Sequence, residues 1–195
     1  MLIRLKNVVI AAGLIFTMAA LSEAQTPGAS IADTPTWEAG LGYQYLHIPD
    51  QNFPFGLNLD GVRHYGKLGI AGEVGWAHGS IDDAGADVSL GMWNFGAGPR
   101  WTGFKAGSTW WPYAQVLAGL ELLHVHAEFE GVDDSDTETA FMIQPGFGAT
   151  FVGGDGWGIF GQVDYRRTFF DEADDSDSSP NNGFRFLIGA RLILD

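Results

Sequence analysis

The sequence predicts an all-β protein: an eight-stranded antiparallel, up-and-down transmembrane β-barrel. Three observations point to it. Apolar residues recur at every second position over segments of about ten residues, which is the period of a β-strand. Short and long connectors alternate along the chain. Glycine occupies 28 of the 195 positions, which disfavours long helices.

Residues 1–24 are predicted to be a signal peptide and not part of the fold. Arg4 and Lys6 form a short basic region, and residues 8–21 are uncharged and mostly apolar. Small residues at Ser22 and Ala24 then predict cleavage before Gln25. The apolar run would span only about 21 Å as a helix, less than the ~30 Å membrane core. Residues 25–35 are predicted to be a flexible N-terminal segment, and residues 36–195 the barrel.

Alternating apolar positions predict eight strands. The clearest is 184–194, where Phe184, Phe186, Ile188, Ala190, Leu192 and Leu194 share one face. The others are predicted at 37–45, 57–65, 70–77, 93–101, 111–128, 141–151 and 159–166. Residues 57–65 have the least regular alternation because of Arg63 and His64. Residues 111–128 also allow a helix, since Leu117, Leu120 and Leu123 have helical spacing.

The predicted connectors are of two kinds. Those at 66–67, 102–109 and 153–156 are short, whereas those at 49–56, 80–90, 129–138 and 171–182 are long and polar. An up-and-down barrel has this alternation when its two ends face different surroundings, and closure leaves no unpaired strand edge in lipid. Pro145 lies within a predicted strand and lacks a backbone N–H, so we expect a bulge there.

A soluble lipocalin-like barrel or a β-sandwich is the alternative fold. Its exposed strand faces would carry Lys, Glu and Thr, whereas the polar faces here are mostly glycine, which suits a narrow barrel interior. Aromatic residues near predicted strand ends favour membrane-interface girdles over core packing. These residues are Trp37, Trp93, Trp101, Trp110, Trp111, Trp157, Phe169 and Phe170.

The chain resembles the small eight-stranded outer-membrane β-barrels of the opacity-protein and outer-membrane-protein-A-like group. The resemblance rests on the signal peptide, the Gly-Ala-Gly-Pro-Arg stretch at 96–100, Trp-Pro-Tyr-Ala at 111–114 and Asn-Gly-Phe-Arg-Phe at 182–186. It implies a location in the cell outer membrane, with lipid and lipopolysaccharide as surroundings. It also implies insertion by the outer-membrane assembly machinery through the C-terminal strand, where Gly189, Leu192 and Leu194 resemble the recognition signal.

Charged residues on the predicted inward faces form a candidate salt-bridge network of four acids and four arginines. Unpaired charges in a narrow interior are costly, and paired ones are tolerated. Such a network is either a structural plug, which we favour, or a gate for ions and small solutes. Its members are Glu38, Glu73, Arg100, Glu121, Asp164, Arg166, Arg185 and Arg191.

Acidic residues are concentrated in three of the long connectors, with no Lys or Arg in those segments. They are Asp82, Asp83, Asp87, Glu128, Glu130, Asp133, Asp134, Asp136, Glu138, Asp171, Glu172, Asp174, Asp175 and Asp177. They could bind Ca²⁺ or Mg²⁺ or bridge lipopolysaccharide through such ions, but no calcium-loop spacing is present, so a solvated acidic rim is favoured. His124 and His126, with Glu128 and Glu130, have a spacing that could bind zinc, or they could have an interfacial role near the extracellular end of their strand.

The sequence predicts neither catalysis nor a cofactor. The net charge of −14 disfavours nucleic-acid binding, and the absence of cysteine excludes disulfides and thiolate metal sites. His78 and Ser80, with Asp82 as the nearest acid, are the only candidates for a lipid-A-acting hydrolase site. We therefore expect a non-enzymatic protein with a structural or surface-interaction role through its acidic extracellular loops. A small pore is the first alternative and a lipid-A-modifying enzyme the second.

Overall fold

The computed structural model describes residues 35–49, 51–83, 86–104, 107–129, 132–154, 156–169 and 181–194. The predicted signal peptide and most of the N-terminal segment lie outside these ranges. No helix in the described ranges is long and apolar enough to cross a membrane. The strands are β1 Trp37–Ile48, β2 Gln51–Phe53, β3 Phe55–Tyr65, β4 Leu68–Asp83, β5 Ala86–Thr102, β6 Trp110–Phe129, β7 Val132–Val152, β8 Trp157–Phe169 and β9 Asn181–Leu194.

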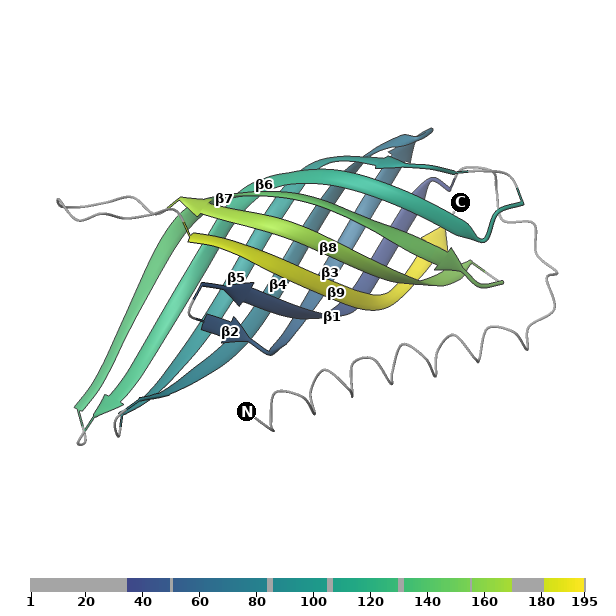
Figure 1. Ribbon diagram of the computed structural model, residues 1–195. Coiled ribbons are helices and arrows are strands. Elements are labelled where there is room, and N and C mark those ends of the chain that lie inside the picture. The colour runs from purple at the N-terminus through teal and green to yellow at the C-terminus, as the bar shows by residue number, and fades with distance from the viewer. Residues whose placement is uncertain are drawn as a thin grey trace.

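Eight strands close into an antiparallel barrel, as the sequence predicts (Figure 1). Each wall strand pairs with its neighbours along the chain, and β1 pairs with β9 from Trp37↔Leu194 to His47↔Phe184. The short strand β2 pairs only with the end of β1, so it is not part of the closed wall. The segment 111–128 is strand and not helix.

The stagger of the strands fixes the width of the barrel. One row of paired residues runs around the wall from β1 to β9: Ala39, Gly61, Gly72, Ala97, Ala118, Ile143, Arg167 and Asn182. The row ends at Asn182 on β9, two residues before Phe184, which pairs with His47 on β1. Because the strands are antiparallel, the row returns to β1 two residues after His47, which is ten residues beyond its start at Ala39. With a rise of ~3.3 Å per residue and ~4.8 Å between strands, this stagger gives a tilt of about 40° and a wall radius of about 8 Å.

The two ends of the barrel differ. The turn end carries the connections at 66–67, 103–109 and 153–156, together with the start of β1 and the end of β9. The hairpin end carries the connections from β1 to β3, β4 to β5, β6 to β7 and β8 to β9. We use these two names below.

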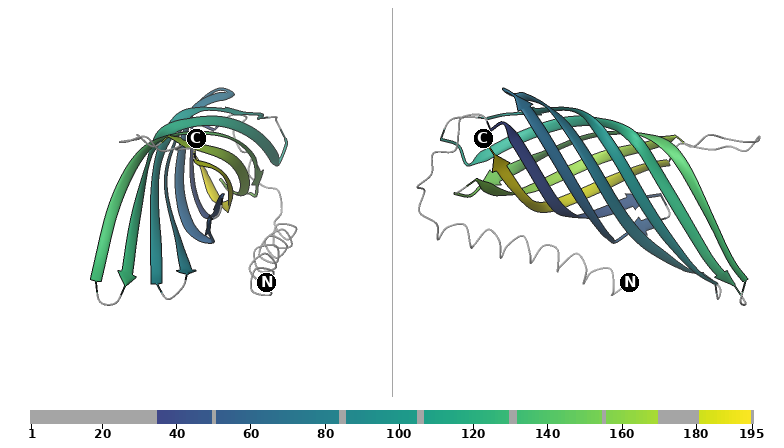
Figure 2. Two further views of the ribbon diagram at one scale, coloured as in Figure 1. Left: turned by 60° about the vertical axis from the view of Figure 1, so that its left-hand side comes forward. Right: turned by 180° about the vertical axis from the view of Figure 1, so that it is seen from behind.

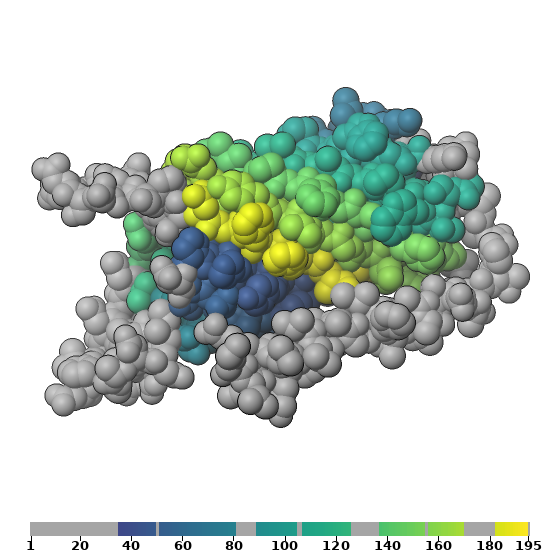
Figure 3. Space-filling model, viewed as in Figure 1, coloured from purple at the N-terminus to yellow at the C-terminus, as the bar shows by residue number. Residues whose placement is uncertain are grey.

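Large apolar side chains cover the outside of the wall. They are Trp37, Leu41, Phe55, Leu57, Leu59, Tyr65, Leu68, Ile70, Val74, Trp93, Phe95, Trp101, Trp110, Val116, Leu120, Phe141, Ile143, Phe147, Tyr165, Phe169, Phe184, Phe186, Leu192 and Leu194, each 38–66% exposed. Figure 3 shows the outer side chains of β9, β8 and β1 packed into a continuous surface. An apolar belt of this kind needs lipid around it, whereas a soluble barrel would bury its apolar face.

Aromatic residues mark both edges of the belt. Trp37, Trp101 and Trp110 are exposed near the turn end. Trp93 pairs with Trp76 towards the hairpin end, and Phe141 pairs with Phe169. The prediction that Trp111 belongs to the girdle is wrong, because Trp111 is only 4% exposed and packs inside the barrel. Phe170 lies outside the described residues.

The polar segments 80–90 and 129–138 are mostly strand, and their prediction as long loops is wrong. β4 and β5 stay paired to Asp83↔Ala86, and β6 and β7 to Phe129↔Val132. Beyond the membrane both faces of a strand contact water, so the alternation of apolar and polar residues that distinguishes a strand from a loop is lost. The segment 49–56 is likewise not a continuous loop, since it contains the short strand β2. Most of the predicted connector 171–182 lies outside the described residues.

The four extended strands form one sheet that projects from the hairpin end (Figure 2, left). β5 and β6 pair as far as Asp87↔Glu128, which joins the two hairpins. β3 begins at Phe55, opposite His78, and β8 ends at Phe169, opposite Phe141. We call residues 79–83, 86–91, 124–129 and 132–140 the projection.

Pro145 causes no bulge, contrary to the expectation from the sequence. It pairs with Val116 in an unbroken β6–β7 ladder. On its other side the pairs Ile143↔Arg167 and Gly146↔Asp164 keep one register. The missing N–H therefore interrupts the ladder towards β8 without shifting the strand.

Candidate functional site

Charged side chains fill the inside of the barrel. The structure places all eight residues of the proposed network there, each at most 6% exposed: Glu38, Glu73, Arg100, Glu121, Asp164, Arg166, Arg185 and Arg191. They face inward because they alternate along their strands with the outward belt residues. Asp60 and His64 on β3 join them. Five carboxylates therefore face four guanidinium groups and one imidazole.

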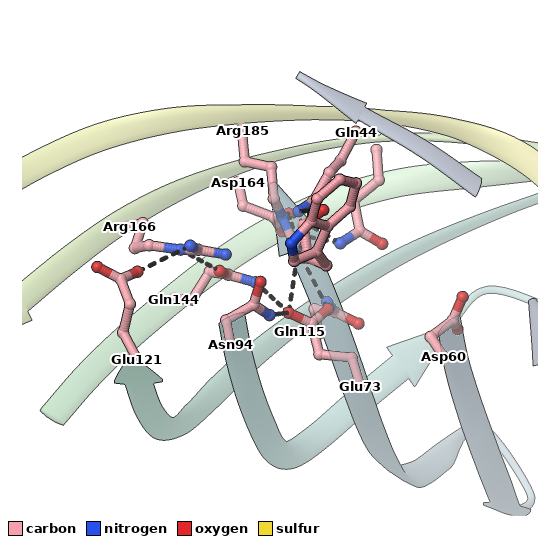
Figure 4. Close-up of polar contacts among 12 residues, drawn as sticks. Gln44, Asp60, Glu73, Asn94, Gln115, Glu121, Gln144, Asp164, Arg166 and Arg185 are labelled. Atoms are coloured by element: carbon pink, nitrogen blue, oxygen red, sulfur yellow. Dashed lines mark hydrogen bonds and ion pairs between the residues drawn. The ribbon is translucent and has the colours of Figure 1, made fainter. Parts of the chain in front are cut away.

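Arg185 is the centre of the middle cluster (Figure 4). Its Nη1 and Nη2 donate to Glu73 Oε1 and Oε2, both at 2.8 Å. Its Nε donates to Asp164 Oδ2, also at 2.8 Å. One guanidinium thus bridges two buried carboxylates, and offsets one of their two negative charges, with the fork geometry that only arginine offers.

Amide side chains complete this cluster. Asn94 and Gln144 each donate to Glu73 Oε1 at 3.0 Å, and Gln162 donates to Asp164 at 2.9 and 3.0 Å. The carboxylate oxygens therefore have neutral donors besides Arg185. A buried polar network is favourable when its members are satisfied in this way.

Towards the hairpin end, Arg166 pairs with Glu121. Its Nη1 lies 2.8 Å from Glu121 Oε2, and its Nε donates to Gln144 Oε1 at 2.8 Å. Gln144 thereby links this pair to the middle cluster through its bond to Glu73. The network is continuous along the barrel axis at this point.

Towards the turn end, two arginines share two carboxylates. Arg191 lies 2.9 Å from Asp60 and 3.2 Å from Glu38, and Arg100 lies 3.3 Å from Asp60 and 3.8 Å from Glu38. Both guanidinium groups lie over the ring of Tyr113, at 4.5 and 5.1 Å from its centroid. The ring face offers electron density to the pair of cations, which reduces the cost of burying them together.

Asp60 and His64 were missing from the network predicted from the sequence. His64 Nε2 lies 3.1 Å from Glu38 Oε1. Arg63 obscured the alternation on β3, since a charge next to His64 leaves the inward face undecided. The sequence did contain a signal, because apolar and polar residues alternate at the start of β3. Leu57 and Leu59 face outward, and Asn58 and Asp60 face inward.

Apolar clusters close the network at both ends. At the turn end Phe104, Trp111, Val152 and Ile193 pack together, with Phe104 and Trp111 edge to face at 4.9 Å. At the hairpin end Leu46, Phe53, Ala77 and Met92 pack together, and Phe53 comes from β2. The charged layer therefore lies between these two apolar caps.

Two glycines show how tightly the interior is filled. A Cβ at Gly146 would overlap Asp164 Oδ1, and a Cβ at Gly75 would overlap Asn94 Oδ1. These glycines let an inward polar side chain from the neighbouring strand lie flat against the wall. Part of the glycine excess is therefore a packing requirement of the network.

His78 and Ser80 lie exposed on the outer face of β4. The His78 ring stacks on Trp76 at 6.1 Å, and no hydrogen bond joins His78 to Ser80 within the described residues. The side chain of Asp82 is outside the description. The structure thus brings the two side chains to one face without the contacts of a nucleophile and its base.

His124 is exposed on β6 and hydrogen-bonds Thr137 Oγ1 at 2.9 Å. The side chains of His126, Glu128 and Glu130 lie outside the description. Among the described residues no three His, Cys, Asp or Glu side chains gather closely enough to hold a metal ion.

Comparison with known proteins agrees with the fold. No protein-family model and no curated protein sequence matches the chain. The structure is similar to Neisserial surface protein A, with a TM-score of 0.56 and 12% identity over 81% of this chain and 96% of that one. It is also similar to the attachment invasion locus protein Ail of Yersinia pestis, with a TM-score of 0.54 and 15% identity over 80% of this chain and 96% of that one.

A second structure of Ail, in complex with the heparin analogue sucrose octasulfate, gives a TM-score of 0.52 and 16% identity over 80% and 96% of the two chains. At these identities the likeness concerns the fold. The chain has the fold of the small eight-stranded outer-membrane β-barrels, and the sequence-based resemblance to that group is confirmed at this level.

Proposed function

We propose that this chain, with the fold of the small outer-membrane β-barrels, displays an acidic four-stranded projection on the cell surface above a sealed barrel. The observation that carries the proposal is the joined pair of hairpins β4–β5 and β6–β7, which continue beyond the apolar belt. A rigid sheet holds a binding surface in place better than separate loops would. The protein acts in this proposal as a surface-interaction module and not as an enzyme.

An outer-membrane location is supported by the apolar belt with aromatic edges, which needs a lipid environment. The predicted signal peptide at residues 1–24 would bring the chain out of the cytoplasm, and the C-terminal strand β9 would present the signal for the assembly machinery. The hairpin end then faces outward and the turn end faces the periplasm.

The sequence of the projection suggests a basic partner. No Lys or Arg occurs between Lys105 and Arg166, whereas the hairpin between β6 and β7 holds Glu128, Glu130, Asp133, Asp134 and Asp136. Opposite charge accelerates association and selects partners. The polyanion bound by Ail does not transfer to this chain, because the projection carries negative charge itself.

A pore is the second candidate, and the two apolar caps argue against it. An open channel needs a continuous polar path, but Phe104 and Trp111 close one end and Phe53 and Met92 the other. We expect the refolded protein to give no discrete openings in a planar bilayer. Reproducible channels in the wild-type protein would support the pore and contradict the sealed barrel.

The orientation is testable with epitope insertions. An epitope between Ala84 and Gly85 should be labelled by antibody on intact cells, because it lies at the tip of the β4–β5 hairpin. The matched control carries the same epitope between Gly66 and Lys67, at the turn end, and should be labelled only after permeabilisation. Reversed labelling would contradict the orientation, and a soluble periplasmic product would contradict the location.

The charge of the projection is testable separately. We compare wild-type protein in lipid vesicles with a variant in which Glu128, Glu130, Asp133, Asp134 and Asp136 are replaced by Gln or Asn. A fluorescent lysine-rich peptide should bind the wild type and lose most of its affinity for the variant, and added salt should weaken wild-type binding. Equal binding to both proteins would contradict a role for the acidic projection.

A further inference from the structure

The strands β1, β3, β4, β5 and β6 form one side of the barrel wall (Figure 2, right). A shallow groove crosses the outer surface of these strands. The groove has a volume of about 690 Å³. Its floor is the row of small residues Ala39, Gly61, Gly72, Ala97 and Ala118, which pair with one another from strand to strand. Four strand spacings of ~4.8 Å make it about 19 Å long, enough for an extended hydrocarbon chain.

Rows of larger side chains bound the groove. On the hairpin side they are Leu41, Leu59, Val74, Phe95 and Leu120, each 38–59% exposed. On the turn side Ile70 and Val116 are 61% and 48% exposed. The hollow follows one row of small residues that pair from strand to strand, so it is a feature of particular residues and not of the barrel shape.

A cationic side chain lies beside the groove, towards the turn end of the barrel. Arg63 is two residues from Gly61 on the same outward face of β3 and pairs with Trp37. Its guanidinium lies 5.1 Å from the Trp37 ring centroid and 5.5 Å from that of Tyr65. No carboxylate within the described ranges forms an ion pair with it.

Few basic side chains of the described residues lie outside the barrel interior, and two of the three are at the turn end. Among the described residues, the basic side chains outside the interior are Arg63, Lys67 and Arg167. Lys67 is exposed in the turn that follows Tyr65, at the same end as Arg63. The turn end therefore presents two cations at the membrane interface beside an apolar groove.

We propose that this groove binds one anionic glycerophospholipid. Arg63 and Lys67 hold its phosphate at the turn-end interface, and an acyl chain fills the groove over Gly61, Gly72 and Ala97. Cations flanked by aromatic rings at an interface attract anionic headgroups, and small residues let a partner approach the backbone closely.

A second copy of the chain fits the groove less well. A two-fold dimer through this wall would bring Arg63 of one copy towards Arg63 of the other, which is unfavourable. The bulky rows on either side would also meet each other before the floor of either groove was covered. A single flexible acyl chain avoids both problems.

The proposal rests on membrane insertion, which is part of the proposed function, and its test uses the refolded full-length protein. Native mass spectrometry of protein released from micelles that contain phosphatidylglycerol and phosphatidylcholine should show one retained phosphatidylglycerol. R63Q should weaken this binding about five-fold, the effect expected from removing one basic side chain at a membrane surface. R167Q removes the exposed arginine at the other end and should leave retention unchanged.

Filling the groove tests the acyl-chain part. G61V and G72V add side chains where a Cβ meets nothing closer than 3.8 Å, so the strands should fold normally. Both should abolish retention. G161V, at an outward glycine of β8 with equal space around its Cβ, is the matched control and should retain the lipid.

The outcomes separate this inference from the proposed function. If the protein fails to show the faster migration of unboiled barrel on gels, membrane insertion is wrong and both fail. If folding is normal but phosphatidylcholine is retained equally, or G61V and G72V still bind, the lipid site is wrong while the surface function stands. A stable dimer that G72V dissociates would assign the groove to a second copy and overturn the lipid site.

Discussion

Replacing Arg185 by Met should destabilise the barrel more than any exposed charge change. Arg185 is fully buried and makes three bonds of 2.8 Å to Glu73 and Asp164. Met fills a similar volume but leaves two buried carboxylates without their cation. Breaking a buried ion pair by removing one partner costs about 3–5 kcal/mol, so we expect a loss of about 4 kcal/mol in the free energy of unfolding.

The assay is reversible urea unfolding in lipid vesicles, followed by the fluorescence of the seven tryptophans. R167M, at an exposed position on β8, is the control and should change stability by less than about 1 kcal/mol. The triple variant R185M/E73Q/D164N removes the uncompensated charges and should recover at least half of the loss. A loss below about 1 kcal/mol for R185M, or no recovery in the triple variant, would refute the account of the network.

Three further results are expected. G146V should lower the free energy of unfolding by about 1–3 kcal/mol because its side chain would displace Asp164, whereas the outward G161V should be nearly neutral in the same urea assay. Deleting residues 190–194 removes β9 pairs with β1 from Leu41 to Trp37, so the barrel should not close and unboiled protein should migrate as unfolded chain; normal gel migration would contradict this. W111A should open the turn-end cap and destabilise the fold by about 3–5 kcal/mol, whereas exposed W110A should cost much less; equal losses would place Trp111 on the outer girdle instead.

Much of the barrel could be predicted from the sequence because membrane strands bury one face in lipid and the other in a narrow interior. That constraint produces clear alternation in residues 184–194, and it also placed Arg185 and Asp164 on inward faces. The alternation is a local signal, so it does not depend on knowing the partners. The individual ion pairs could not be predicted, since they depend on the stagger between strands that are distant in sequence.

The misses have physical reasons as well. The projection lies beyond the apolar belt, where water on both sides removes the alternation, so its strands have the sequence pattern of loops. Trp111 is inside because Trp110 already occupies the outward position, and the sequence does not say which of two adjacent tryptophans faces lipid. The groove arises from five small residues on five strands, which only the pairing register aligns.

The most direct test of the closed transmembrane barrel is a disulfide between its first and last strands. The chain has no cysteine, so Leu41→Cys with Ala190→Cys introduces a single pair at residues that face each other across β1 and β9. Their Cα separation in an antiparallel ladder, about 4.5–5.5 Å, suits a disulfide. The account predicts near-complete cross-linking in lipid vesicles for this pair and none for the control pair Leu41→Cys with Phe147→Cys. Absence of the first cross-link, or equal cross-linking of both pairs, would contradict a closed barrel with this register.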